Sequence, residues 1–189
     1  MRITQVEATT LIIPLDTPTS MSSRTINERH YTFVRVRTQE GVEGIGFCNI
    51  GNKAGHLGTL AVRDLLRDVV IGQNLHQVEQ IWDLMFRDSL LHGRTGVVMR
   101  AMSAIDIALW DAKSRSAGLP LYQYLGGYRE NSVPAYASGG YYLKGKTPSD
   151  LGNELQKYVG MGFPAVKMKV GRVPLELDTQ RIAAAREAI

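Results

Sequence analysis

The sequence predicts an α/β fold in two parts, in which a mixed sheet and helix segment is followed by alternating strands and helices. Three observations support this prediction. Stretches rich in β-branched residues come first, helical periodicity dominates the middle of the chain, and strand and helix patterns alternate from Asn131 onward. Alternation of this kind is typical of a parallel sheet or a (β/α) barrel.

The first segment is predicted to form a small antiparallel sheet. Residues 2–13, 31–38 and 42–48 are rich in β-branched residues, and a glycine-containing turn separates the last two stretches. Between the first two strands we expect a long polar loop over residues 14–29, and a glycine-rich loop over residues 49–58 follows the third strand. Loops of this length in compact domains are usually functional or disordered.

Helices are predicted in the middle of the chain. Apolar residues recur at helical spacing over residues 57–66 and 75–85, with Gly72 between the two as a stop. The strongest pattern spans residues 97–116 and ends before Gly118. Because this last helix is nearly apolar, we expect it to lie in a core.

The second part supplies two strand and helix units. Strands are predicted over residues 133–137 and 165–170, and helices over residues 148–159 and 175–189. Thr147 precedes the first of these helices as an N-cap, followed by a helix-opening proline. A closed eight-stranded barrel needs roughly 250 residues, so we expect two of eight units here, in a fragment or in part of a longer natural chain.

Composition excludes several classes of protein. The 44% hydrophobic content is that of a globular chain, and the net charge of +4 comes from scattered residues rather than from a basic run interleaved with aromatics. We therefore expect small anions as partners and no nucleic acid. Since no apolar run approaches the roughly 20 residues of a membrane span and Cys48 is the single cysteine, we expect no membrane partner and a cytoplasmic location.

The most informative stretch is the strand that carries Lys167 and Lys169. Side chains alternate along a strand, so these two lysines share one face while Val166, Met168 and Val170 share the other. In a barrel the lysines would point inward near the carboxyl end of the strand, where active sites are built. Two adjacent cations depress each other's pKa, which makes a lysine a usable general base. A solvent-exposed edge strand is the alternative for this pattern taken alone.

Two segments together carry a resemblance to a known family. The sequence AVKMKVG, preceded by GMGF, and the sequence AMSAIDIALWDAKSRSAGLPLYQYLGG resemble the mandelate racemase and muconate lactonizing branch of the enolase superfamily. The resemblance covers essentially the whole chain. It implies an N-terminal α+β capping domain with its joining helix over residues 1–130. It also implies the first two β/α units of a C-terminal TIM-type barrel over residues 131–189.

The resemblance also implies roles for three residues. Lys169 matches the base that removes the proton alpha to a substrate carboxylate, and Lys167 matches the partner that binds the carboxylate and tunes the base. Ser138 matches the serine that contacts the carboxylate, although a hydroxyl that merely terminates a strand remains the alternative. The family binds Mg²⁺ through carboxylates on the third to fifth barrel strands, so we expect the ligands beyond Ile189 and assign none in this segment.

The two predicted loops match the loops that read the distal part of the substrate in the family. Arg24 in the first, and Asn49 and Lys53 in the second, are candidate substrate-binding residues, with solvated loop residues as the alternative. Their polar and basic character, and the stretches GFCNIGNKAG, HGRTG and SGG, most resemble the acid-sugar dehydratases. We therefore expect a sugar-acid substrate and a homo-oligomer.

Several reactions share the same first step. Dehydration of a sugar acid is the first expectation, followed by racemisation or epimerisation and then by muconate-type cycloisomerisation. A further alternative of a different class is a non-catalytic domain that serves as a binding or oligomerisation module.

Two weaker patterns are interpreted as structural. Gly41, Gly44 and Gly46 approach a dinucleotide-binding fingerprint, but no helix opens directly after them. Asp106 and Asp111 interrupt an apolar helix at a spacing that does not place them face to face. We therefore expect both carboxylates to be capping or pairing groups at the interface between cap and barrel.

Overall fold

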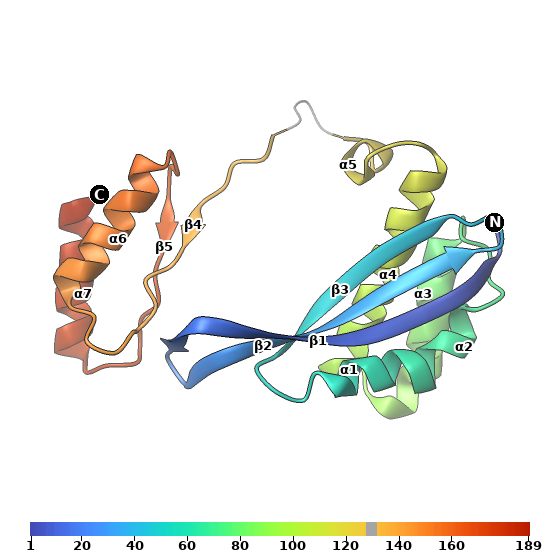
Figure 1. Cartoon of the computed structure of the whole chain (residues 1–189), viewed down its shortest axis with the longest axis horizontal. Coiled ribbons are helices and arrows are strands. Elements are labelled where there is room, and N and C mark those ends of the chain that lie inside the picture. Colours follow the sequence, from blue (N-terminus) through green and yellow to red (C-terminus); the bar gives the residue numbers. More distant parts are fainter. Residues whose placement is uncertain (128–131) are drawn as a thin grey trace. The chain divides into compact units, whose positions relative to one another are not determined.

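The computed structural model describes residues 1–127 and 132–189 (Figure 1). The chain divides into two compact units. The first comprises Met1–Pro14 and, of the described residues, those from 28 to 127, while the second comprises Leu15–Asn27 and Ser132–Ile189. The grouping of Leu15–Asn27 with the C-terminal segment was not predicted.

A three-stranded sheet forms the first layer of the first unit. Its strands are β1 (Ile3–Met21), β2 (Arg24–Thr38) and β3 (Glu43–Gly51), in the order β1-β2-β3. β2 and β3 pair antiparallel, with the register running from Tyr31 opposite Asn49 to Arg37 opposite Glu43. The predicted antiparallel arrangement is therefore confirmed for these two strands.

Helices cover one face of this sheet (Figure 1). They are α1 (His56–Leu60), a π-helical segment (Ala61–Leu66), α2 (Arg67–Val70), α3 (Val78–Asp88), a 3₁₀ turn (Ser89–His92), α4 (Val97–Ser116) and α5 (Leu121–Tyr124). The bounds of α4 agree with the prediction. The first predicted helix extends to Val70, and Gly72 follows with a φ of +87° that few other residues adopt.

The core lies between the sheet and α4. Side chains of β2 alternate, so that Val34 and Val36 are fully buried against the helices while Arg35 is exposed. On β3 the inward positions include Gly44 and Gly46, and a Cβ atom built on either would lie 2.1 Å from a carbonyl oxygen of α4. These glycines therefore permit close helix and sheet contact, which confirms their structural interpretation.

The prediction of a loop over residues 14–29 is wrong. Both strands continue through it, and only Ser22 and Ser23 form the turn of a long hairpin (Figure 1). The polar sequence hides these strands because none of their side chains between residues 14 and 29 is buried, which removes the alternation that marks a half-buried strand. The second predicted loop is also shorter than expected, since β3 runs to Gly51 and α1 begins at His56.

The second unit contains two parallel strands and two helices. β4 (Ala137–Ser138) pairs with β5 (Val166–Lys167), and α6 (Pro148–Gly160) packs against α7 (Leu175–Ala188). Parallel strands that alternate with helices were predicted and are confirmed, although both strands are shorter than expected. The predicted start of α6 is also confirmed, because Thr147 and Asp150 form a reciprocal capping box.

The apolar side of β5 faces the helices, as the alternation predicts. Leu151 and Leu155 of α6 and Ala185 of α7 form a small buried cluster, and Val166 and Met168 pack against it. This orientation leaves the two lysines of the same segment on the opposite side.

Hydrogen bonds explain why the tip of the hairpin belongs to the second unit. The backbone N–H groups of Ser20 and Tyr142 each donate to the other residue's carbonyl oxygen at 3.1 Å. The Arg172 guanidinium donates to the Met21 carbonyl at 2.9 Å and to the Thr25 hydroxyl at 3.3 Å.

None of the helices in residues 1–127 and 132–189 has the length and apolar character needed to cross a bilayer.

Candidate active site

The two strands of the second unit place Ser138, Lys167 and Lys169 together. Ser138 lies directly opposite Lys167 in the parallel register, so their side chains project from the same face of the sheet. Lys169 lies two residues later, just past the end of β5, and its amine interacts with that of Lys167. The juxtaposition expected from strand alternation is therefore present.

The two lysines differ in their surroundings. Lys167 is exposed, whereas Lys169 is half-buried. Partial burial, and then the nearby Lys167 ammonium, lower the pKa of Lys169 below its usual range. The Lys169 Nζ atom also lies 5.4 Å from the centre of the Tyr141 ring. Lys169 is thus the better placed of the two to act as a base near neutral pH.

The expected enclosure around these lysines is not formed by the described residues. The side chains of Ser138 and Lys167 are exposed. Two adjacent strands form only one wall of a cavity, and a closed barrel interior needs strands on every side. Because Lys169 is half-buried and two strands supply only one wall, a partly enclosed cavity around both lysines stays a prediction.

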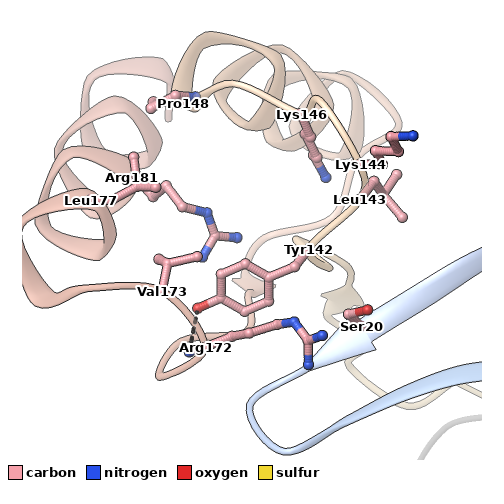
Figure 2. A pocket seen from close by; sticks show the side chains of 10 residues that line it. All are labelled: Ser20, Tyr142, Leu143, Lys144, Lys146, Pro148, Arg172, Val173, Leu177 and Arg181. Carbon is pink, nitrogen blue, oxygen red and sulfur yellow. Dashed lines mark hydrogen bonds between the residues drawn. The ribbon is translucent and has the colours of Figure 1, made fainter.

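A pocket of about 360 Å³ lies beside this site, among the loops that follow both strands (Figure 2). Its walls come from the loop after β4, the start of α6, the loop after β5, α7 and the hairpin: Ser20, Tyr142, Leu143, Lys144, Lys146, Pro148, Arg172, Val173, Leu177 and Arg181. Figure 2 shows the Tyr142 ring between the side chains of Arg181 and Arg172. Two of the cations are paired with carboxylates, Lys146 with Glu154 and Arg181 with Asp178.

Sequence reasoning missed the charged residues behind the strands. Asp178 and Arg181 lie on the buried face of α7 and form an ion pair at 2.8 Å. Glu154 of α6 accepts hydrogen bonds from the Gly140 N–H at 3.0 Å and from the Tyr158 hydroxyl at 2.9 Å. An acidic and a basic residue three apart on the inward face of a predicted helix is the signal that identifies the first pair.

The candidate residues from the two predicted loops are distributed over both units. Arg24 begins β2 and is exposed, and it belongs to the second unit with Lys169. Asn49 on β3 and Lys53 in the turn before α1 belong to the first unit, and both are exposed. The Asn49 carbonyl accepts a hydrogen bond from Arg100. A substrate-binding role for these residues stays a prediction.

The two carboxylates of α4, Asp106 and Asp111, lie in environments that indicate a structural role. Asp111 accepts a hydrogen bond from the Ile45 N–H at 2.9 Å and pairs with Arg115 at 3.0 Å. Its predicted pairing role is therefore confirmed, but both partners lie within the first unit. Burial raises the pKa of Asp106. In residues 1–127 and 132–189, no three His, Cys, Asp or Glu side chains come together as a metal site.

Comparison with known proteins then identifies the family. Residues 3–126 match the description "Mandelate racemase / muconate lactonizing enzyme, N-terminal domain". The chain belongs to the mandelate racemase and muconate lactonizing enzyme family. This membership confirms the resemblance found in the sequence and places the chain in the enolase superfamily.

Relatives in this family match the whole length of the chain. D-galactarolactone cycloisomerase from Agrobacterium fabrum is 35% identical over 190 residues, which cover 100% of the chain and 49% of the relative. A racemase from Streptomyces coelicolor A3(2), solved with bound magnesium, superposes with a TM-score of 0.91 at 35% identity, covering 98% of the chain and 52% of the racemase.

A dehydratase structure is also similar in fold. L-talarate/galactarate dehydratase from Salmonella typhimurium LT2, liganded with Mg and L-lyxarohydroxamate, superposes with a TM-score of 0.88 at 29% identity, covering 99% of the chain and 49% of the dehydratase. The family member described here therefore spans less than half the length of the curated relatives it matches. Similar relatives include lyases and isomerases, so family membership alone does not select one reaction.

Proposed function

We propose that this chain is the amino-terminal part of a Mg²⁺-dependent enzyme that removes the proton alpha to a substrate carboxylate. The observation that carries the proposal is the arrangement at the ends of β4 and β5. Lys169 is a half-buried amine with a lowered pKa beside the exposed Lys167 ammonium, and Ser138 lies opposite Lys167 in the register. One strand end thus offers a base and a cation side by side.

The chemistry assigned to these residues is a proton transfer. The Lys167 ammonium and the Ser138 hydroxyl donate hydrogen bonds to the substrate carboxylate and hold the α-carbon near Lys169. The neutral amine of Lys169 takes the α-proton, and the electron pair of the broken C–H bond spreads into the carboxylate to give an enediolate. Since proton transfer requires a neutral base, the lowered pKa of Lys169 increases the fraction of active enzyme near neutral pH.

Magnesium would supply the remaining charge stabilisation when bound to the carboxylate. The described residues do not fit such an ion, because they contain no group of three candidate ligands. We therefore assign the ligands to parts of the enzyme other than the residues described here. The support is that similar structures about twice as long hold magnesium.

We further propose that residues 131–189 are the first two units of a TIM-type barrel, with residues 1–130 as the capping domain. Parallel pairing of β4 with β5 and the packing of α6 on α7 support this assignment. The second unit also leaves apolar side chains exposed, such as Val170 and Ile182, and further barrel units would cover them.

A sugar acid is the substrate class that we propose, with dehydration as the first choice. The proposal is supported by relatives named for galactarate and galactarolactone, and by the polar and basic candidates Arg24, Asn49 and Lys53, which we assign to the distal hydroxyls. Racemisation or epimerisation is the second choice and cycloisomerisation the third. All three reactions are considered because each begins with the same proton transfer.

The experiment is a substrate screen of the natural full-length protein. Mono- and dicarboxylic sugar acids are incubated with the protein and Mg²⁺, and 2-keto-3-deoxy products are detected by semicarbazide. We expect turnover of at least one acid, its loss with EDTA and its return with added Mg²⁺. Failure to turn over or exchange any acid in the panel, by a folded protein that still binds them, would favour the non-catalytic module.

A further inference from the structure

The second unit buries an ion pair directly behind the strand that carries Lys169. The side chains of Arg181 and Asp178 are only 7% and 8% exposed and lie 2.8 Å apart. Two charges are costly to remove from water unless further hydrogen bonds satisfy them. The partners of this pair therefore indicate what it holds in place.

Arg181 donates to the backbone at the ends of both strands. One guanidinium nitrogen donates to the Lys169 carbonyl at 3.0 Å, and the other donates to the Gly140 carbonyl at 3.0 Å. The guanidinium also lies 3.9 Å from the centre of the Tyr142 ring. A single rigid side chain thus spans the segment after β4 and the candidate base after β5.

Asp178 fixes the same segment from the other side of Lys169. It accepts hydrogen bonds from the Gly171 N–H at 2.7 Å and from the Tyr142 hydroxyl at 2.7 Å, in addition to its bond with Arg181. The backbone is therefore held at Lys169 and again two residues later. Burial opposes ionisation of Asp178, but these hydrogen bonds hold its pKa below the usual range.

The segment after β4 is held equally firmly. The Gly140 carbonyl is bound by Arg181, and its N–H is bound by Glu154 at 3.0 Å. Gly140 has a φ of +62°, and a Cβ atom built there would lie 2.5 Å from the Cβ of Met168. It is therefore packed against the residue that separates the two lysines.

We propose that Arg181 is a positioning residue for Lys169, acting through its bond to the Lys169 carbonyl, with Asp178 holding the guanidinium in place. The proposal rests on the proposed role of Lys169 as base. A displacement of the Lys169 backbone would carry its side chain away from Lys167 and Tyr141. Because proton transfer depends on sub-ångström placement, Arg181 would influence kcat without contacting the substrate.

The test compares Arg181→Lys, Arg181→Met and the matched control Arg186→Met in the natural full-length protein with Mg²⁺. Arg186 lies on the same helix and is exposed. We expect Arg181→Met to lower kcat by about 10- to 100-fold while KM changes far less. Arg181→Lys keeps the charge but loses the planar fork, so an intermediate loss is expected. Arg186→Met should match the wild type.

A second readout separates this proposal from the proposed function. Lysine labelled with ¹³C at Cε reports the titration of Lys169 by NMR, with the signal assigned by its loss in Lys169→Arg, and it needs no catalytic activity. Among the described residues, Lys167, Tyr136 and Tyr141 face the Lys169 amine, and the paired Arg181 and Asp178 lie against its backbone. If Arg181 sets the position of Lys169, the titration midpoint of Lys169 should be at higher pH in folded Arg181→Lys than in the wild type. The reason is that the Lys169 amine moves away from Lys167 while the positive charge at position 181 remains.

A wild-type midpoint and a wild-type kcat in folded Arg181→Lys would overturn the positioning role, whatever the stability of Arg181→Met. A wild-type protein that never exchanges an α-proton would instead overturn the proposed function, and the NMR titration would still decide whether Arg181 positions Lys169.

Discussion

At the scale of residues, burial distinguishes two lysines that the sequence presents as equals. Lys167 is exposed, so a carboxylate can reach its side chain, whereas Lys169 is half-buried beside it and against Tyr141. Burial first, and then repulsion from Lys167, lower the pKa of Lys169. The proposed function accordingly assigns carboxylate binding to Lys167 and proton removal to Lys169.

Replacing Lys167 by Met should move the pH dependence of the reaction. A lysine base acts when neutral, so kcat/KM rises with pH through the pKa of Lys169. Removal of the Lys167 ammonium removes one cause of the lowered pKa, and the rising limb should shift to higher pH. Lys167→Arg keeps the charge and should keep the limb near its wild-type position. A limb at unchanged or lower pH in Lys167→Met would contradict this assignment.

Strand alternation was sufficient to predict that Lys167 and Lys169 share a face, and that face lies opposite the apolar cluster as expected. Alternation could not predict the role of Arg181, because the sequence around Arg181 does not show that its guanidinium reaches the carbonyls of Gly140 and Lys169. Such bonds join residues 12 and 41 positions apart in the chain. Enclosure of the site likewise depends on walls that two strands do not provide.

At the scale of elements, the contact between β3 and α4 depends on missing side chains. Gly44 and Gly46 let the backbone of α4 lie directly on the strand, opposite Ala104, Ala108 and Ala112. Small residues on both elements thus replace the interlocking of large ones. The glycine pattern that resembles a nucleotide-binding fingerprint is a packing feature.

Substitution of Gly46 by Ala should destabilise the protein. The added Cβ would lie 2.1 Å from the Ala104 carbonyl oxygen and 2.7 Å from the Ala108 nitrogen, so one backbone must shift. Overpacking of this kind typically costs about 1–3 kcal/mol of unfolding free energy. Gly160→Ala is the matched control, because no atom lies within 4 Å of its added Cβ. Equal urea midpoints for the two variants would show that α4 yields without cost.

The strands of the hairpin tip could not be predicted from the local sequence. Residues 15–27 are polar on both faces, so neither alternation nor helical periodicity predicts their strands. Their position is set by tertiary contacts, namely the backbone pairing of Ser20 with Tyr142 and the bonds from Arg172. By contrast, the capping box at Thr147 is local, and the start of α6 was predicted correctly.

At the scale of the whole molecule, the second unit is assembled from two distant segments. Leu15–Asn27 comes from the hairpin, and Ser132–Ile189 supplies the strands and helices that carry the lysines. Arg172 lies directly after the Lys169 strand and holds the hairpin at Met21 and Thr25. The candidate base and the hairpin are therefore structurally linked through one short loop.

Arg172→Ala should loosen the hairpin tip. Loss of two hydrogen bonds from an exposed guanidinium is expected to cost about 1 kcal/mol, which corresponds to roughly fivefold faster local opening. Hydrogen exchange at the amides of Ser20 and Tyr142 should speed up by this factor, while exchange in α4 stays unchanged. Arg186→Ala serves as the control on the same unit. Unchanged protection at Ser20 in Arg172→Ala would show that backbone pairing alone holds the tip.

The central claim is that Lys169 removes the α-proton, and the direct measurement is solvent-deuterium incorporation into a sugar-acid substrate, followed by NMR in the natural full-length protein with Mg²⁺. Lys169→Met should slow exchange by at least about 10²-fold, the low end of general-base catalysis, while substrate binding is largely retained. Lys157→Met, which removes an exposed lysine of α6, should exchange like the wild type. Near wild-type exchange by Lys169→Met would contradict the account.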